Sequence, residues 1–561
     1  MFIMKKIVKQ ILLFYLVIVL FKILLSSFIL SPSAFSDEYI YMKMARSFFF
    51  DFNFNVHNLV VDIYPPLYSM LLSITYIFND MNIAYFFMKV INALISSLVI
   101  IPAFLLSREF LNEKKSLIIA LLVSIIPSNF SFTPYIISEN LFYPLSLFIV
   151  YFIYKSFSGN KYNYNILIGI FLGLAYLTRT AAIGLLGAFI LSYLVFFIIN
   201  KTDRKLLLNK FLLSIFLFII VISPWIMRSF YLYGFDLKLL FGPYSRSVEN
   251  IVTDFKLVNY IVRGLVYLGY LVLASLIIFP VKFYNLFNKK NIKFLVLFFA
   301  LLITSLIIVI KHGRVVIFFE WFTGRYVGRY IDILLPLIFI GGFIGAQVKK
   351  INKVAIFIFG FLLIMASLLT LHSLFPVNNL SLTWVGILKY LFEFIFFGKT
   401  NHSIEFFNGS LIFFAMFFVF LLLLLLFLER KFSFNKLIPY FFIFFILLNL
   451  LNYGVTHYDS KSNWYDKEQM QLGLWLNEYD SDKISDILFD IGSCGDINKY
   501  EQERICGGKF YEKTIIGYWL NDNIFIGDLS DAENYDYVIS KKELNFPLIK
   551  EYNGIYVYEI L

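Results

Sequence analysis

The chain has 561 residues, of which 60% are hydrophobic and only 15% are charged. Its apolar residues form near-continuous runs of roughly 17 to 25 residues, the length that spans the hydrocarbon core of a bilayer. This pattern excludes a soluble globular enzyme and predicts a multi-pass α-helical protein of the cell membrane. The net charge of +11 does not indicate nucleic-acid binding, because the basic residues lie in short loops between the apolar runs.

The first apolar run, KIVKQILLFYLVIVLFKILLSSFIL, lacks a small-residue cleavage site and is expected to be a retained helix rather than a signal peptide. The hydrophobic pattern predicts about thirteen transmembrane helices. We expect them at residues 10–30, 83–107, 116–135, 140–156, 166–178, 182–200, 211–227, 259–281, 294–310, 331–348, 354–372, 410–428 and 437–452.

Lysines and arginines collect in alternate loops, which marks those loops as cytoplasmic. The N-terminus is therefore expected inside and the C-terminal domain outside. The long loops 31–82, 228–258, 311–330 and 373–409 then all face outward, as do three Asn-x-Ser sequons at Asn379, Asn401 and Asn408. Residues that could bind a substrate or take part in a reaction are thus concentrated on one side of the membrane.

We predict two domains, a transmembrane domain at residues 1–452 and a soluble extracytoplasmic α/β domain at 453–561. In the second domain, KEQMQLGLWLNEY has helical spacing, whereas ISDILFD, NIFIGD, YDYVIS and GIYVYEI are typical of strands. Cys494 and Cys506 are the only cysteines; an outside location favours a disulfide over a metal pair. The domain carries no nucleophile motif or phosphate loop, which favours a cap or a recognition surface.

The stretch SDEYIYMKMAR follows the first span and forms part of the first extracytoplasmic loop, 31–82. Ser36 suits a helix N-cap, and Asp37 and Glu38 suit the first turn of that helix. This structural explanation is compatible with catalysis. Together with Lys43 and Arg46, two acids at the bilayer surface also suit a reaction on a phosphate-bearing lipid.

The same loop continues with DIYPPLYSMLLSITYIF. Pro65 and Pro66 stop a preceding helix, and the apolar segment after them is too short to span, so it predicts an interfacial helix. His57 stands alone and is read as a loop residue rather than a metal ligand.

Several segments together resemble the GT-C superfamily of integral membrane glycosyltransferases, especially protein O-mannosyltransferases and lipid A aminoarabinose transferases. The first resemblance is the Asp-Glu pair followed, about 30 residues on, by a Pro-Pro-Leu segment. The others are TPYIISENLFYPL with Glu139, GLAYLTRTAAIGLL with Arg179, SPWIMRSFYLYG with Arg228, and GRYVGRYIDILLPL with Arg325 and Arg329.

The resemblance implies a GT-C-like membrane domain that transfers a sugar from a polyprenyl-phosphate carrier to a lipid, glycan or protein acceptor outside the membrane, with inversion. Asp37 would be the general base, and Glu38 would orient the sugar or acceptor or help bind a cation. The lipid phosphate would be held by Lys43, Arg46 and one or more of Arg179, Arg228, Arg325 and Arg329. Arginines at span ends also snorkel to headgroups without any binding role.

Two departures limit the resemblance. Aminoarabinose transferases usually have Lys before the Pro-Pro, where this chain has Tyr64, so the sugar and the subfamily stay open. The Trp-Trp-Asp-Tyr-Gly motif of oligosaccharyltransferases is only faintly matched by NWYDKEQ. The family branch mostly works without a catalytic metal, so no cofactor is required, although a divalent metal is possible.

Three alternatives remain open. One is an oligosaccharyltransferase-like enzyme, one a multi-pass transporter, and one a membrane scaffold with a binding tail. A transporter would carry ionisable groups near the membrane midplane, often in paired repeats, whereas this sequence keeps its charges near the outer ends of the spans.

Overall fold

A computed structural model describes most of the chain. The described residues are 2–32, 36–56, 59–61, 64–159, 161–200, 203–236, 240, 242, 257–312, 317–318, 321–322, 328–348, 352–369, parts of 420–431, 433–461, 467–480, 485–490 and 516–560. They form two compact units: unit 1 is Met1–Lys22, Leu94–Phe132 and Ser138–Tyr453, and unit 2 is Ile23–Ala93, Thr133–Ile137 and Gly454–Leu561.

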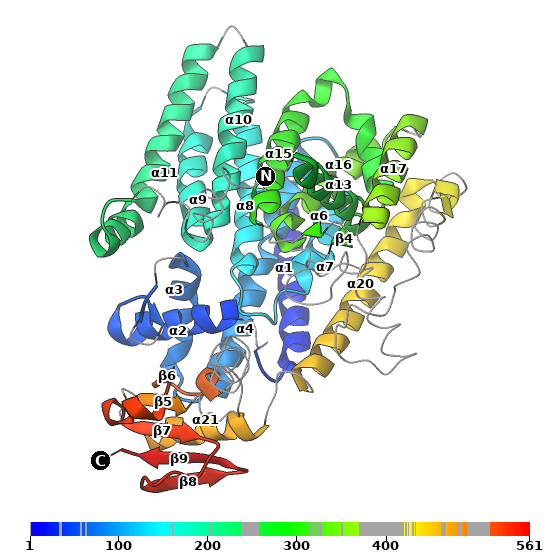
Figure 1. Cartoon of the computed structure of the whole chain (residues 1–561). Coiled ribbons are helices and arrows are strands. Elements are labelled where there is room, and N and C mark those ends of the chain that lie inside the picture. The colour runs from blue at the N-terminus through cyan, green and yellow to red at the C-terminus, as the bar shows by residue number, and fades with distance from the viewer. Residues whose placement is uncertain are drawn as a thin grey trace. The chain divides into compact units, whose positions relative to one another are not determined.

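Unit 1 is built from helices (Figure 1). They are α5 (Ile100–Arg108), α6 (Glu113–Ile125), α7 (Pro127–Phe130), α8 (Glu139–Ser156), α9 (Asn163–Thr178), α10 (Ile183–Ile199), α11 (Arg204–Tyr233), α13 (Leu257–Ala274), α14 (Ile278–Phe283), α15 (Ile292–His312), α16 (Leu335–Gly345), α17 (Lys353–Leu369) and most of α20 (Phe434–Asp459). Two-residue strands β3 (Ile317–Phe318) and β4 (Trp321–Phe322) also lie here. Helices α1 (Phe2–Ser27) and α4 (Met81–Ser97) contribute to both units.

Six helical stretches of the described chain are long and apolar enough to cross a membrane, and one bent pair adds a seventh candidate. The six are Lys6–Ser27, Met81–Arg108, Thr180–Ile199, Arg204–Tyr233, Lys289–Ile310 and Phe434–Tyr458. The membrane character and the mostly helical fold class are therefore confirmed. The number of thirteen spans stays a prediction, and the expected span 410–428 lies largely outside the described residues.

Helices α9 and α11 pack closely because α9 presents glycines to its neighbour. A Cβ added at Gly169 would lie 2.5 Å from the carbonyl oxygen of Ser214, and one at Gly173 would lie 2.5 Å from a methyl group of Val221. Small residues at such positions let two helix backbones approach within a membrane, where close packing supports helix association. This packing fixes the end of α9, where Arg179 follows.

The expected span 259–281 is broken in the structure. Helices α13 and α14 meet at an angle of 97°. Leu276 and Ile277 lie between them with φ angles of 60° and 52°. Pro280 lies in the first turn of α14, and a helix continuous through the break would lack the hydrogen bond from residue 280 to the Leu276 carbonyl. The apolar run alone predicted one continuous helix.

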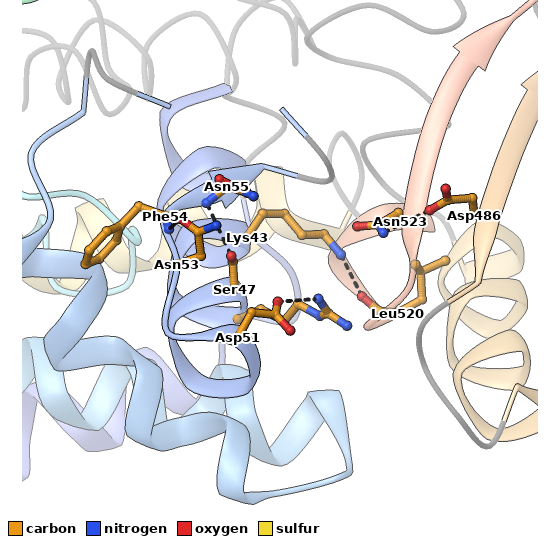
Figure 2. A network of polar contacts seen from close by, with 10 residues as sticks. Lys43, Ser47, Asp51, Asn53, Phe54, Asn55, Asp486, Leu520 and Asn523 are labelled. Carbon is orange, nitrogen blue, oxygen red and sulfur yellow. Dashed lines mark hydrogen bonds and ion pairs between the residues drawn. The ribbon is translucent and has the colours of Figure 1, made fainter. Parts of the chain in front are cut away.

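Unit 2 contains the first loop and the C-terminal domain. The loop forms α2 (Ser36–Asp51), a small hairpin of β1 (Asn55–Val56) and β2 (Leu59–Val60), and then α3 (Leu67–Ser73) with the 3₁₀ turn Ile74–Ile77. The helix expected after the Pro-Pro pair is thus present as a short helix, and its place at the membrane interface stays a prediction. The turn after α2 is closed by a hydrogen bond of 3.2 Å from the Asn55 amide to the Ser47 hydroxyl (Figure 2).

The C-terminal domain is a five-stranded sheet with helix α21 (Lys467–Tyr479). The strand order is β6-β5-β7-β9-β8, from β5 (Asp486–Asp490), β6 (Asn523–Gly527), β7 (Tyr537–Ser540), β8 (Leu548–Tyr552) and β9 (Ile555–Glu559). β5 is parallel to β6 and β7, whereas β9 is antiparallel to β7 and β8. Leu472 and Leu476 of α21 pack with Ile516 and Leu520 in the core on one face of the sheet. The small α/β domain predicted from the sequence is confirmed.

Candidate active site

Asp37 lies in the first turn of α2, where the positive end of the helix dipole favours a carboxylate. Its side chain accepts a hydrogen bond of 2.8 Å at Oδ1 from the Tyr64 hydroxyl. The Tyr64 ring is held edge-on by Tyr41, with 5.4 Å between ring centroids, and Tyr41 in turn contacts Tyr68 at 5.0 Å. A half-buried carboxylate is therefore oriented by a phenol that aromatic packing keeps in place.

Glu38 is fully buried. Its Oε2 accepts a hydrogen bond of 2.9 Å from the backbone amide of Ile136. The two adjacent acids thus differ in environment: Asp37 is partly exposed, and Glu38 ties α2 to the segment Thr133–Ile137, which lies in the same unit. Only the first of them has the exposure that a group reacting with a substrate needs.

The cations of α2 also have partners. Lys43 is 4% exposed, and its Nζ donates a hydrogen bond of 2.7 Å to the carbonyl oxygen of Leu520 (Figure 2). Arg46 lies 3.5 Å from the Asp51 carboxylate, measured from Nη1 to Oδ2, and its guanidinium lies over the Phe50 ring. Lys43 is thus directed at the C-terminal domain.

A second group of predicted residues converges in unit 1, and we call Glu139, Arg179 and Arg329 the arginine cluster. Glu139 begins α8, Arg179 follows α9 with extended backbone, and Arg329 lies in the 3₁₀ turn Gly328–Tyr330. Nη1 of Arg179 contacts Oε1 of Glu139, and Nε of Arg329 lies 3.2 Å from the same oxygen. The side chains are only 11%, 3% and 1% exposed for Arg179, Arg329 and Glu139, respectively.

Aromatic and backbone contacts hold the two guanidinium groups of the arginine cluster. The Cζ atoms of Arg179 and Arg329 lie 4.5 Å and 5.6 Å from the centroid of the Tyr330 ring. The Tyr143 hydroxyl donates a hydrogen bond of 2.7 Å to the carbonyl oxygen of Arg329. Two fixed guanidiniums share one carboxylate, so they can still form bonds to an incoming phosphate.

Of the remaining site candidates, the structure describes Arg228. Arg228 lies over the ring of Trp225 on its own helix, α11, at 4.8 Å. Arg325, His57 and the cysteines Cys494 and Cys506 lie outside the described residues.

Sequence reasoning missed a buried acid near the arginine cluster. Asp332 is 1% exposed, and its Oδ1 accepts a hydrogen bond of 2.7 Å from the Tyr270 hydroxyl. Tyr143, which holds Arg329, also feels the charge of Asp332 and Glu139, so these groups lie near one another. The signal was present in the sequence, because an acid at the start of an apolar run is expensive unless it has a partner or a function.

Sequence reasoning also missed a carboxyl pair in the C-terminal domain. Asp480 and Asp522 are both buried, and the Asp480 carboxyl acts on the pKa of Asp522. Burial and then the Asp480 carboxyl raise the pKa of Asp522 to about 8, although Lys43 and Arg46 act in the opposite direction. The folded chain therefore keeps a proton that the unfolded chain, with an ordinary pKa of 3.8, releases. Stability contributed by this group falls as the pH rises from about 4 to about 8.

Within the part of the chain that the structure describes, no group of three or more His, Cys, Asp or Glu side chains is placed to hold a metal ion.

The fold and the sequence now define the class of protein. Residues 64–227 match the family model described as dolichyl-phosphate-mannose-protein mannosyltransferase. The whole architecture has the GT-C fold of integral membrane glycosyltransferases, which confirms the resemblance drawn from the sequence motifs. No curated protein sequence matches the chain significantly.

Among solved structures, the chain is similar to ArnT from Cupriavidus metallidurans bound to undecaprenyl phosphate. That likeness has a TM-score of 0.57 at 11% sequence identity and covers 100% of this chain and 98% of ArnT. The apo state of the same protein gives a TM-score of 0.55 at 11% identity, covering 99% and 98% of the two chains. At this identity the likeness establishes the fold.

Proposed function

We propose that this protein transfers a single sugar or small glycan from a polyprenyl-phosphate carrier to a lipid, glycan or protein acceptor at the outer face of the membrane. The observation that carries the proposal is the convergence of Arg179 and Arg329 on one carboxylate oxygen of Glu139. In a chain with the GT-C fold, such a buried pair of guanidiniums suits a phosphate, which guanidiniums bind bidentately.

The donor class is supported by the comparisons. The matched family is named for dolichyl-phosphate mannose, and ArnT was solved with undecaprenyl phosphate bound. Both are polyprenyl phosphates, so we assign the arginine cluster to the phosphate of such a lipid. The outer face follows from the distribution of lysines and arginines, which predicts a cytoplasmic N-terminus and an extracytoplasmic C-terminal domain.

Asp37 is proposed as the general base of one inverting displacement. The acceptor hydroxyl attacks the anomeric carbon of the sugar, its proton passes to the Asp37 carboxylate, and the bond from that carbon to the phosphate oxygen breaks. The leaving group is the polyprenyl phosphate, whose negative charge Arg179 and Arg329 would stabilise. Tyr64 orients the base through its hydrogen bond, the role that a second residue often has beside a catalytic base.

The test uses purified full-length protein, labelled polyprenyl-phosphate sugars and membrane acceptors. We expect Asp37→Asn to abolish transfer while leaving the protein folded. Asp51→Asn is the matched control on the same helix, because the Asp51 side chain is 55% exposed and its ion pair with Arg46 is a surface contact. Full activity of the Asp37 variant would refute the assignment.

The alternative functions give different results in the same experiment. Transfer that stops on addition of a chelator favours an oligosaccharyltransferase-like site with a metal. Movement of label across a reconstituted bilayer without transfer favours a transporter. If neither transfer nor movement of label occurs, the result favours a scaffold.

A further inference from the structure

One side of α2 packs against residues 516–522 of the C-terminal domain, which we call the 516–522 segment. Tyr39 meets Tyr518 edge-on, with 5.3 Å between ring centroids. One turn further along α2, Lys43 donates its hydrogen bond of 2.7 Å to Leu520 (Figure 2). The contact therefore extends over a full turn of the helix that carries Asp37.

The side chains in this contact are closely packed. A Cβ added at Gly517 would lie 2.9 Å from ring carbon Cε2 of Tyr39, closer than side chains normally approach. Tyr39, Lys43, Tyr518 and Leu520 are all less than 9% exposed. Because a lysine ammonium loses much hydration on burial, its hydrogen bond to a backbone carbonyl fixes both partners.

The same segment also contacts α4. Trp519 is 2% exposed and meets Tyr85 edge-on, with 6.0 Å between ring centroids. The 516–522 segment thus contacts α2 and the part of α4 that belongs to unit 2.

The contact reaches the acids at the start of α2. Burial raises the pKa of Tyr518 well above its ordinary value, and the charges of Glu38 and Asp37 raise it further. Tyr518 therefore lies close enough to both carboxylates to feel their charge. A side chain of the C-terminal domain belongs to the surroundings of Asp37.

We propose that the 516–522 segment positions α2 for the reaction and that Lys43 is a positioning residue acting through this helix, not a ligand of the donor phosphate. This inference rests on the proposed function, in which Asp37 is the base. It gives the C-terminal domain a role in the transfer step itself, beyond covering the membrane domain or recognising an acceptor.

Physical reasons support a positioning role. An isolated helix of this length is marginal in water, so its placement depends on tertiary contacts. Asp37 follows every rotation of α2 because it lies in the first turn of that helix. A displacement of about 1 Å at a reacting group can lower a rate on the order of 100-fold.

The experiment compares Lys43→Gln and Gly517→Ala in the full-length protein. Both are expected to lower kcat on the order of 100-fold while the donor KM stays within about twofold, because the phosphate contacts lie elsewhere. Hydrogen exchange of the amides in 36–51 should become faster in both variants. Lys542→Gln, an exposed lysine of the same domain, should change neither quantity.

Tyr518 supplies a conservative comparison. Tyr518→Phe keeps the ring against Tyr39 and should retain normal exchange in α2, whereas Tyr518→Ala should behave like Gly517→Ala. This pair keeps the test valid if the added methyl group at Gly517 prevents folding.

Two results would overturn the inference. One is a raised donor KM with unchanged kcat in Lys43→Gln, which identifies a phosphate ligand. The other is normal hydrogen exchange in α2 of every variant. If the unaltered protein transfers no sugar, the proposed function fails, and faster exchange in α2 still confirms that the 516–522 segment holds this helix.

Discussion

Replacing Glu139 by Gln is a direct test of the arginine cluster. The substitution keeps the shape and one oxygen acceptor of the side chain but removes its charge. Arg179 and Arg329 would then share a buried site without a carboxylate. We expect two effects of opposite sign, a less stable protein and tighter binding of polyprenyl phosphate.

The size of the stability loss follows from the geometry. At 3.2 Å, the separation of Arg329 Nε from Glu139 Oε1, two unit charges attract by about 5 kcal/mol at an effective dielectric constant near 20. Removing one partner of a buried pair costs about 3–5 kcal/mol, and the retained amide oxygen of Gln offsets part of that cost. For a chain of 561 residues, whose unfolding entropy is about 1.2 kcal/mol per kelvin, a net loss of about 2 kcal/mol corresponds to a melting temperature lower by about 2 °C.

The size of the binding effect follows from the lost negative charge. A phosphate about 10 Å from the Glu139 carboxylate would be repelled by about 1.7 kcal/mol at the same dielectric constant. Without that repulsion, the Kd for polyprenyl phosphate is expected to fall about 15- to 20-fold.

Thermal melting in detergent and equilibrium binding of polyprenyl phosphate measure the two effects. Glu113→Gln is the control, because Glu113 pairs with Arg108 at 2.8 Å while the two side chains are 37% and 41% exposed. Such a surface pair contributes less than about 1 kcal/mol. A Glu139 variant as stable as the unaltered protein, or one that binds polyprenyl phosphate more weakly, would refute the reasoning.

Three further predictions concern other contacts. Tyr64→Phe removes only the hydroxyl that donates to Asp37, so kcat should fall about tenfold at an unchanged donor KM; steady-state kinetics with an unaltered kcat would contradict the orienting role. Asp522→Asn should raise the melting temperature at pH 8.5 and much less at pH 5, because the stability contributed by Asp522 falls as the pH rises from about 4 to about 8; an equal gain at both pH values would argue against the raised pKa of Asp522. Gly342→Ala places a Cβ 2.9 Å from a backbone oxygen of α14 and should lower the free energy of unfolding by about 1–3 kcal/mol, as measured by melting against the unaltered protein.

Much of the helical architecture was predictable because apolar runs and polar breaks determine it directly. The spans expected at 140–156 and 182–200 correspond closely to α8 (Glu139–Ser156) and α10 (Ile183–Ile199). The break between α13 and α14 was missed, although Pro280 in the first turn of α14 is a signal for it. The positive φ angles of Leu276 and Ile277, which their side chains disfavour, were not predictable, because tertiary packing imposes them.

The C-terminal sheet was also predicted in part. The four strands with alternating or continuous apolar residues were predicted, whereas β8 (Leu548–Tyr552) was missed. β8 is an edge strand that carries Lys550 and Glu551, and charged edge strands protect a sheet from further pairing. The polarity that suits an edge also removes the hydrophobic signal by which a strand is recognised.

The candidate site was predictable as a set of residues but not as a set of contacts. From the sequence, Lys43, Arg179 and Arg329 were all candidates for the lipid phosphate. The structure separates them by their partners, because the two arginines face a carboxylate, whereas the Lys43 ammonium faces a backbone carbonyl. Two guanidiniums that share one carboxylate can still bind another anion, whereas an ammonium buried against a backbone carbonyl is arranged to hold a chain in place. The partner, which comes from a segment distant in sequence, therefore decides between a binding and a positioning role.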